Sequence, residues 1–264
     1  MQHFFVEPGQ ICGKTITIVG DDVNHIKNVL RMKVGEELSV SNGLDDNDYR
    51  CVIDSIEEDS IILKLIFIKE DGIELPARIT LFQGLPKSDK MELIIQKAVE
   101  LGVHEIVPVA TKRAVVKLDD KKSKSKVARW QGISEAAAKQ SKRAIVPEVR
   151  DVMTIKEAIS YASSFEVAAI PYEMAEGMTA TKQWISDVIN KVKNHASDTS
   201  DANSTNKVRI GIFIGPEGGF DESEIDMAMQ NNIQPISLGR RILRTETAGM
   251  TTLSILMYHL EIME

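Results

Sequence analysis

Apolar and polar residues alternate in short segments over the first 73 residues of the chain. The segments are rich in β-branched residues, and turn residues such as Gly20 and the Asn42–Gly43 pair separate them. A two-residue period is typical of strands with one buried face, and strands at this close spacing favour a small β-barrel. The pattern predicts strands over residues 4–7, 14–19, 36–43, 48–57 and 60–70, and a helical period predicts one helix over 21–32.

From about residue 76 the pattern changes to apolar strands that alternate with amphipathic helices. Nearly continuous apolar strands between such helices are typical of a mostly parallel sheet covered on both sides. A polar segment, residues 194–206, is predicted to be a surface loop. We therefore expect an α/β protein with a small β domain over 1–73 and an α/β domain over 74–264. The predicted strands are 78–86, 104–110, 146–149, 165–172, 207–215 and 234–239, and the predicted helices are 88–102, 125–141, 154–162, 179–192, 221–232 and 247–263.

Composition excludes several classes of protein. With 43% hydrophobic and 27% charged residues the chain resembles an ordinary globular protein, and it has no apolar run long enough for a membrane span. Its first residues lack the pattern of a secretion signal, and Cys12 and Cys51 make no disulfide framework, so the cytoplasm is the expected location. No zinc or dinucleotide motif is present, and Pro8 replaces the first glycine of a P-loop in PGQICGKT. We expect no metal.

Charge is distributed unevenly along the chain. The whole chain carries −7, yet residues 111–150 hold twelve basic and four acidic residues, a net of +8. A basic region of this kind suits phosphate contacts, because each neutralised phosphate releases counterions. A solvated lysine-rich loop explains the same charge, since residues 117–126 alone supply five lysines. Charge by itself leaves both interpretations open.

Three predicted strands of the C-terminal half end in unusual loops, at 168–173, 214–220 and 238–244. Ligands of open α/β sheets bind outside the carboxyl ends of the strands. In the second loop, IGPEGGF, the glycines permit close backbone approach and positive φ, although a strand-to-helix turn capped by Asp221 explains them equally. In the third, LGRRILR, the apolar residues Ile242 and Leu243 stand between arginines, a combination that suits a flat heterocycle.

IGPEGGF followed by LGRRILRTETA resembles the SPOUT class of S-adenosylmethionine-dependent RNA methyltransferases. HIKNVLRMKVGE, LFQGLPKSDKMELIIQKAVELGV, RWQGISEAAAKQSKR and VPEV narrow the resemblance to the bacterial RsmE family, which methylates N3 of a uridine in 16S ribosomal RNA. The similarity covers nearly the whole chain except 194–206. One departure is that Lys139 and Lys142 stand where many relatives carry Glu and Gly, which only adds positive charge.

The resemblance implies a fold, a cofactor and partners. It implies a PUA-like RNA-binding barrel over 1–73 and a methyltransferase domain over 74–264 with a C-terminal trefoil knot formed by the three strand-end loops. It further implies a homodimer that binds S-adenosyl-L-methionine in a bent conformation and acts on 16S ribosomal RNA within the small subunit. Two alternatives stay open: a SPOUT enzyme that methylates ribose 2′-O of tRNA, and a non-catalytic RNA-binding assembly factor.

Candidate site residues follow from the motifs and the resemblance. For catalysis we expect Arg244 or Arg241 to stabilise charge on the uracil oxygens and Glu246 to act as base or to orient the base, although dipole complementation explains Glu246 and a buried ion pair explains Arg244. The expected cofactor-binding residues are Ile170, Tyr172, Glu173, Ile214, Gly215, Pro216, Glu217, Gly218, Gly219, Leu238, Gly239, Ile242, Leu243, Arg244 and Thr245. The expected RNA-binding residues are His25, Arg31, Lys87, Lys112, Arg113, Lys117, Arg129, Gln140, Lys142 and Arg143.

Overall fold

The computed structural model describes residues 1–70, 72–172, 175, 177–198 and 207–263. The chain forms two compact units. The first comprises Met1–Glu74 together with Ala138–Val146, and the second comprises Leu75–Ala137 together with Pro147–Glu264. The short segment of the first unit therefore comes from the middle of the range that the sequence analysis assigned to the C-terminal domain.

The first unit is built on a six-stranded sheet in the order β1-β4-β5-β6-β3-β2. Neighbouring strands of this sheet are antiparallel except β1 and β4, which are parallel. In place of the helix predicted over 21–32, the structure has the short helix α1 (Asp21–Asn24), which a π-helix continues over His25–Val29. The strands are β1 (His3–Phe5), β2 (Ile11–Cys12), β3 (Thr15–Val19), β4 (Glu37–Ser41), β5 (Asp48–Ile56) and β6 (Ser60–Lys69).

Alternation along these strands gives the first unit its core. In β3, Ile16 and Ile18 are fully buried while their neighbours Thr15 and Val19 are exposed. The same period buries Ile61 and Leu63 of β6. These side chains join one apolar cluster with residues of β1, β4, β5 and the helical segment. Burial of this kind contributes about 1.5–3 kcal/mol for each large aliphatic side chain.

Within the first unit, ion pairs attach the segment Ala138–Val146 to the segment Met1–Glu74. The guanidinium of Arg143 donates to the Glu74 carboxylate, with Nε 2.8 Å from Oε1, and both side chains are more than nine-tenths buried. The backbone N–H of Ala144 also donates to Glu74, at 3.0 Å. A second pair, Lys139 to Asp22 at 2.8 Å, is partly exposed. Because a buried charge without a partner is costly, the Arg143–Glu74 pair is the stronger constraint.

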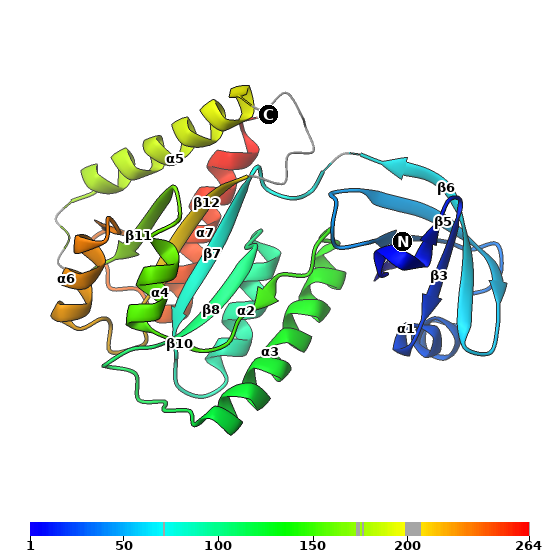
Figure 1. Ribbon diagram of the computed structural model, residues 1–264, viewed down its shortest axis with the longest axis horizontal. Coiled ribbons are helices and arrows are strands. Elements are labelled where there is room, and N and C mark those ends of the chain that lie inside the picture. Colours follow the sequence, from blue (N-terminus) through cyan, green and yellow to red (C-terminus); the bar gives the residue numbers. More distant parts are fainter. Residues whose placement is uncertain (71, 173–174, 176, 199–206, 264) are drawn as a thin grey trace. The chain divides into compact units, whose positions relative to one another are not determined.

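The second unit is an α/β structure around a seven-stranded sheet (Figure 1). The main strand order is β10-β8-β7-β12-β11-β13, with β9 also paired to β8, and every pair is parallel. This confirms the predicted parallel sheet. The strands are β7 (Ala77–Gly84), β8 (Glu105–Ala110), β9 (Glu148–Val149), β10 (Met153–Thr154), β11 (Val167–Pro171), β12 (Val208–Ile214) and β13 (Gln234–Ile236).

Helices cover both faces of this sheet. On one face α7 packs against β12 and β7, with α2 and α5 beside it, and on the other face α4 and α6 pack together (Figure 1). Phe82 and Phe213 stack on adjacent strands, with ring centroids 4.3 Å apart, within the core under α4 and α6. The helices are α2 (Lys90–Glu100), α3 (Asp120–Ser141), α4 (Ile155–Ala162), α5 (Thr179–Asp198), α6 (Glu222–Gln230) and α7 (Thr245–Glu261).

Several elements differ from the sequence prediction; α3, for example, begins at Asp120 and not at residue 125. Residues 194–198, expected in a polar loop, continue α5, and the remainder of that predicted loop, 199–206, lies outside the described residues. The two-residue strand β10 was not predicted, because a segment this short shows no period. Within the described part of the chain, no helix combines the length and apolarity needed to cross a membrane.

Candidate active site

The loops of interest leave the sheet at the carboxyl ends of neighbouring strands. The strand order changes direction between the adjacent strands β7 and β12. On the β7 side of this point the sheet continues with β8 and β10, and on the β12 side it continues with β11 and β13. Residues Gln83 and Ile214 are paired at the ends of these two strands. A change of direction of this kind is where open α/β sheets bind their ligands. The loops after β7 and β12 therefore define the centre of the candidate site.

Tight backbone packing joins these two loops. A Cβ on Gly84 would stand 2.6 Å from Pro216 Cδ and 2.7 Å from Pro216 N, so only glycine fits there. Gly215 is packed in the same way against Gly219, which has φ +65° and donates its N–H to the Pro216 carbonyl at 2.9 Å. The predicted turn IGPEGGF is thus held close to the end of β7.

Gly84→Ala is expected to displace the loop at Gly215 and Pro216 and to cost about 1–3 kcal/mol of stability, because backbone atoms cannot yield as a flexible side chain does. Chemical unfolding measures the loss of stability, and calorimetric titration with S-adenosylmethionine, the cofactor that the sequence resemblance implies, measures the effect of the displaced loop. The control is Gly132→Ala in α3, where a Cβ meets nothing within 4 Å and helix propensity favours alanine. Equal stability of the two variants would contradict the close approach.

A buried chain of hydrogen bonds connects three of the elements. Gln83 Nε2 donates to Thr245 Oγ1 at 2.9 Å, and that hydroxyl donates to the Gly215 carbonyl at 2.6 Å. Gln83 is fully buried, and its Oε1 has no hydrogen-bond partner among the described residues. The end of β7 therefore fixes both the loop after β12 and the first residue of α7.

A charged cluster lies over the same elements. Lys90 Nζ is 3.0 Å from Glu217 Oε1 and 3.4 Å from Glu246 Oε2, and the backbone N–H of Lys87 donates to both Glu217 oxygens at 3.2 Å. Burial alone would raise the pKa of Glu217, but hydrogen bonds from its own backbone, Lys90 and Lys87 outweigh burial and lower that pKa. The hydrogen bond to Glu217, together with the attraction of Glu246, raises the pKa of Lys90. Glu217 is therefore a carboxylate and Lys90 an ammonium group at neutral pH.

The loop after β13 carries exposed arginines. Its start is fixed, because Thr181 Oγ1 donates to the Ser237 carbonyl at 2.7 Å and accepts from the Ser237 N–H at 3.0 Å. Gly239 then turns the chain with φ +106°. Ile242 is 80% exposed, an apolar side chain with no cover in the described structure. The guanidinium groups of Arg240, Arg241 and Arg244 are exposed and have no ion-pair partner in the described part of the chain, so the buried ion pair considered for Arg244 is wrong.

The loop after β12 leads into α6 through a well-ordered cap. Asp221 accepts from the N–H of Ser223 while Glu224 accepts from the N–H of Asp221, which is the predicted capping box. Hydrogen bonds from Ser223 and Lys112 lower the pKa of Asp221 to about 2. Arg113 lies 3.6 Å from Asp221. Part of the basic charge that the sequence analysis assigned to RNA thus faces Asp221.

The predicted cofactor residues fall on neighbouring strand ends. Ile170 is buried in β11, and the N–H of Tyr172 donates to the Ile236 carbonyl at 3.0 Å, which joins the ends of β11 and β13. Ile214 through Gly219 form the loop after β12, and Leu238 through Thr245 form the loop after β13 with the start of α7. Glu173 lies outside the described residues.

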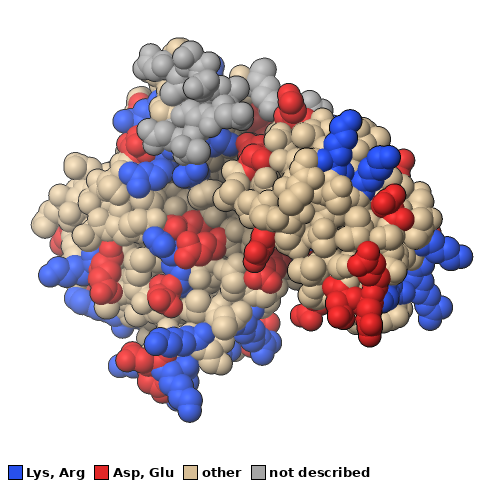
Figure 2. Space-filling model, turned by 45° about the vertical axis from the view of Figure 1, so that its right-hand side comes forward, with Lys and Arg blue, Asp and Glu red and all other residues tan. Residues whose placement is uncertain are grey.

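The predicted RNA residues divide between the two units. Arg143 is only 4% exposed and paired with Glu74, so its assignment as a phosphate contact is wrong. Arg129 is exposed but pairs with Glu92 at 2.9 Å. Figure 2 shows Lys and Arg side chains in small groups among Asp and Glu on the face that it displays. The exposed candidates of the first unit are His25, Arg31, Gln140 and Lys142, and those of the second are Lys87, Lys112, Arg113, Lys117 and Arg129.

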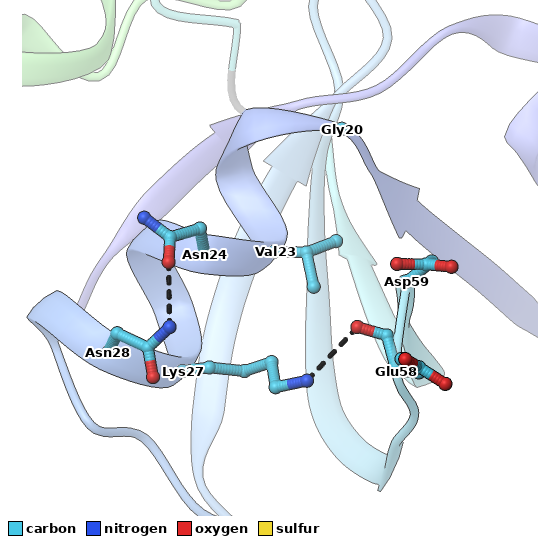
Figure 3. A pocket seen from close by; sticks show the side chains of 7 residues that line it. All are labelled: Gly20, Val23, Asn24, Lys27, Asn28, Glu58 and Asp59. Carbon is cyan, nitrogen blue, oxygen red and sulfur yellow. Dashed lines mark hydrogen bonds between the residues drawn. The ribbon is translucent and has the colours of Figure 1, made fainter.

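The first unit also has a polar pocket of about 290 Å³ (Figure 3). Lys27 Nζ donates to the carbonyl oxygens of Glu57 and Glu58 at 2.9 and 3.0 Å, so its charge is held by the wall of the pocket. Glu58 and Asp59 also line it, which disfavours an anion. This pocket belongs to the first unit, whereas the strand-end loops belong to the second.

Sequence reasoning missed Gln83, Gly84 and Lys90 as site residues. They lie in QGLPKSDK, which spans the end of the predicted strand 78–86 and the start of the predicted helix 88–102, and a strand end is the same signal that singled out the other three loops. The segment was not recognised because its residues are ordinary for a strand-to-helix turn. Among the described residues, no group of three or more His, Cys, Asp or Glu is arranged to hold a metal ion.

Comparisons with known proteins agree with this geometry. A family model described as an RNA methyltransferase domain matches residues 73–257, and one described as an RNA methyltransferase PUA domain matches residues 18–66. The fold and its loops are therefore those of an RNA methyltransferase with an N-terminal PUA-like domain. Ribosomal RNA small subunit methyltransferase E of Bacillus subtilis is 35% identical over 100% of this chain and 98% of its own length. The chain belongs to the ribosomal RNA small subunit methyltransferase E family.

Two solved structures extend the comparison. Ribosomal RNA small subunit methyltransferase E from Neisseria gonorrhoeae, bound to S-adenosyl methionine, is 27% identical with a TM-score of 0.79, covering 98% of this chain and 97% of its own. A putative methyltransferase from Legionella pneumophila in complex with the same cofactor is 28% identical with a TM-score of 0.77, covering 97% and 96%. The family resemblance drawn from the sequence is confirmed, and the trefoil knot stays a prediction.

Proposed function

We propose that this chain transfers a methyl group from S-adenosylmethionine to N3 of a uridine in 16S ribosomal RNA, in the cytoplasm and as a homodimer. One observation carries this proposal: in a chain of this family, three features lie together at one end of the sheet. They are the contact between Gly84 and Pro216, the hydrogen bond between Gln83 and Thr245, and the exposed LGRRILR loop. Relatives that carry the name of a small-subunit ribosomal RNA methyltransferase supply the class of substrate.

The residues present fit the cofactor. Gly219 and Gly239 both have positive φ and open space where a Cβ would stand, so a ligand can approach their backbone closely. Ile242 offers an uncovered apolar surface, which suits the face of an adenine ring. Ile170, Tyr172, the loop from Ile214 to Gly219 and the loop from Leu238 to Thr245 would hold the cofactor. Glu217 is committed to Lys87 and Lys90, so we assign it a structural role in this site.

S-adenosylmethionine would supply the electrophilic methyl group. In the transfer, uracil N3 gives an electron pair to the methyl carbon, the electron pair of the carbon–sulfur bond passes to sulfur, and S-adenosylhomocysteine is the leaving group. The protein must therefore accept or relay the proton of N3 and stabilise charge on O2 and O4. Arg244 precedes the first helical residue of α7, with an exposed guanidinium that fits the second task. Glu246 follows two residues later with a carboxylate that is largely buried and fits the first.

Methylation of small ribosomal subunits that lack the modification tests the proposed function. The purified protein, S-adenosylmethionine and such subunits are expected to yield a methyl group on N3 of one uridine, located by mass spectrometry of 16S fragments. A methyl group on ribose would support the 2′-O alternative instead. Failure to bind the cofactor in calorimetry would support a non-catalytic assembly factor.

Reversing three exposed charges is expected to weaken RNA binding. Salt dependence is measured as the slope of log K, the association constant for RNA, against log salt concentration. Lys87→Glu, Lys117→Glu and Lys142→Glu together should reduce the magnitude of this slope by about 2, because each phosphate contact contributes about 0.7–0.9 to it. Filter binding between low and moderate salt measures the slope. The control reverses Lys182, Lys191 and Lys193, exposed on α5, for the same change in charge. Equal slopes in both variants would mean that the three predicted residues are solvated surface.

A further inference from the structure

Lys90 occupies a central position that the sequence motifs do not assign. It is the first residue of α2, and its ammonium group reaches one carboxylate in the loop after β12 and another in the first turn of α7. The three side chains are between 17% and 29% exposed, so solvent screens them only partly. Lys90 thus links three segments that are far apart in the sequence.

The two carboxylates differ in what else they bind. Glu217 also accepts from the backbone N–H of Lys87 with both oxygens. Glu246 Oε2 is buried and has no hydrogen-bond partner, and Lys90 is the cation paired with it among the described residues. Glu246 Oε1 has no hydrogen bond with a described residue. The position of Glu246 therefore depends on Lys90, whereas Glu217 has an additional anchor.

We propose that Lys90 is a positioning residue for methyl transfer: it holds Glu246 by Oε2 and leaves Oε1 to accept the proton that leaves N3 of the uracil, directly or through water. This role rests on the proposed function. Lys90 is shared between two carboxylates, so the cluster of Lys90, Glu217 and Glu246 keeps a net charge of −1 and the ion pair does not neutralise the base. Glu217 in turn holds the ammonium in place.

The test compares Lys90→Met, which removes the charge and keeps an unbranched chain, with Lys90→Arg, which keeps the charge. Lys90→Met is expected to lower kcat about 10- to 100-fold, because a displacement of about 1 Å at a reacting group costs up to about 100-fold. The KM for the small subunit and the dissociation constant of S-adenosylmethionine should stay within about threefold. Lys90→Arg should restore kcat to within about threefold of wild type. Single-turnover methylation and calorimetry supply these values.

Lys97→Met is the matched control. Lys97 lies on the same helix and forms its own ion pair with Glu100 at 2.8 Å, so the variant removes one lysine and one ion pair from α2. We expect it to keep wild-type kcat. A double-mutant cycle with Glu246→Gln then tests the route of action: Lys90→Met should have almost no further effect in the Glu246→Gln background, since both changes disable the same carboxylate.

Four results would overturn the inference while the wild-type protein methylates N3. The first is wild-type kcat in Lys90→Met. The second is a raised KM alone in that variant, which would make Lys90 an RNA contact. The third is a parallel loss of cofactor affinity and folding in Lys90→Met, and the fourth is that its effect and that of Glu246→Gln are additive. Absence of N3 methylation by the wild-type protein would instead refute the proposed function. The wild-type reaction, run beside each variant, therefore separates the two failures.

Discussion

Arg244→Ala is expected to lower kcat for methyl transfer about 100- to 1000-fold, while the dissociation constant of S-adenosylmethionine changes by less than about threefold. The guanidinium is exposed beside the start of α7 and has no partner in the described part of the chain, so it is available to the negative charge that develops on the uracil oxygens. Removing one donor to such charge typically costs this factor. Single-turnover assays and calorimetry measure the two quantities separately.

Two neighbouring arginines make this experiment specific. Arg241→Ala tests the other candidate for the same task. Arg240→Ala removes the same charge four residues before Arg244, further from the start of α7. We expect Arg240→Ala to stay close to wild type. Full turnover by Arg244→Ala would remove its catalytic assignment, and a loss confined to cofactor affinity would make it a cofactor-binding residue.

Arg143→Met is expected to destabilise the first unit by about 3–5 kcal/mol, since it leaves the Glu74 carboxylate buried without its cation. Both tryptophans, Trp130 and Trp184, lie in the second unit, so their fluorescence follows that unit during unfolding. Hydrogen exchange of amides in β4 and β5 follows the first unit. Protection there should fall about 100- to 1000-fold or more, while the fluorescence transition moves less.

Lys139→Met provides the comparison within the same segment. Its pair with Asp22 is partly exposed, so its removal should cost less than about 1 kcal/mol. The double variant Arg143→Met with Glu74→Gln should recover most of the loss, because no charge then remains buried. Similar protection from hydrogen exchange in Arg143→Met and Lys139→Met would show that the buried Arg143–Glu74 pair stabilises the first unit no more than the partly exposed Lys139–Asp22 pair does.

Long, periodic elements of this protein could be predicted from the sequence alone. The apolar face of residues 88–102 predicts α2, and the motifs IGPEGGF and LGRRILR predict two loops. The structure joins these loops through the hydrogen bond from Thr245, the residue after LGRRILR, to the Gly215 carbonyl. The sites that the sequence did not reveal depend on spatial partners. Lys90 looks like any lysine at a helix start until Glu217 and Glu246 are seen beside it.

Arg143 shows the opposite error. In the sequence it belongs to a basic region of net +8, and nothing local indicates that Glu74, 69 positions away, neutralises it. Charge patterns describe a segment, whereas burial depends on which distant segment covers it. Lys117, in the same basic region, is exposed, so its assignment as an RNA contact stays a prediction.

The division of the first unit between two stretches of chain has a consequence during protein synthesis. Its sheet is complete once Lys69 has been made, but its buried Glu74 acquires Arg143 only when translation has reached the segment that ends at Val146. At about 5–20 residues per second, the ribosome needs about 4–14 s to pass from Glu74 to Val146. Throughout that interval Glu74 lacks Arg143, so the first unit cannot complete its native contacts before the ribosome has passed Val146.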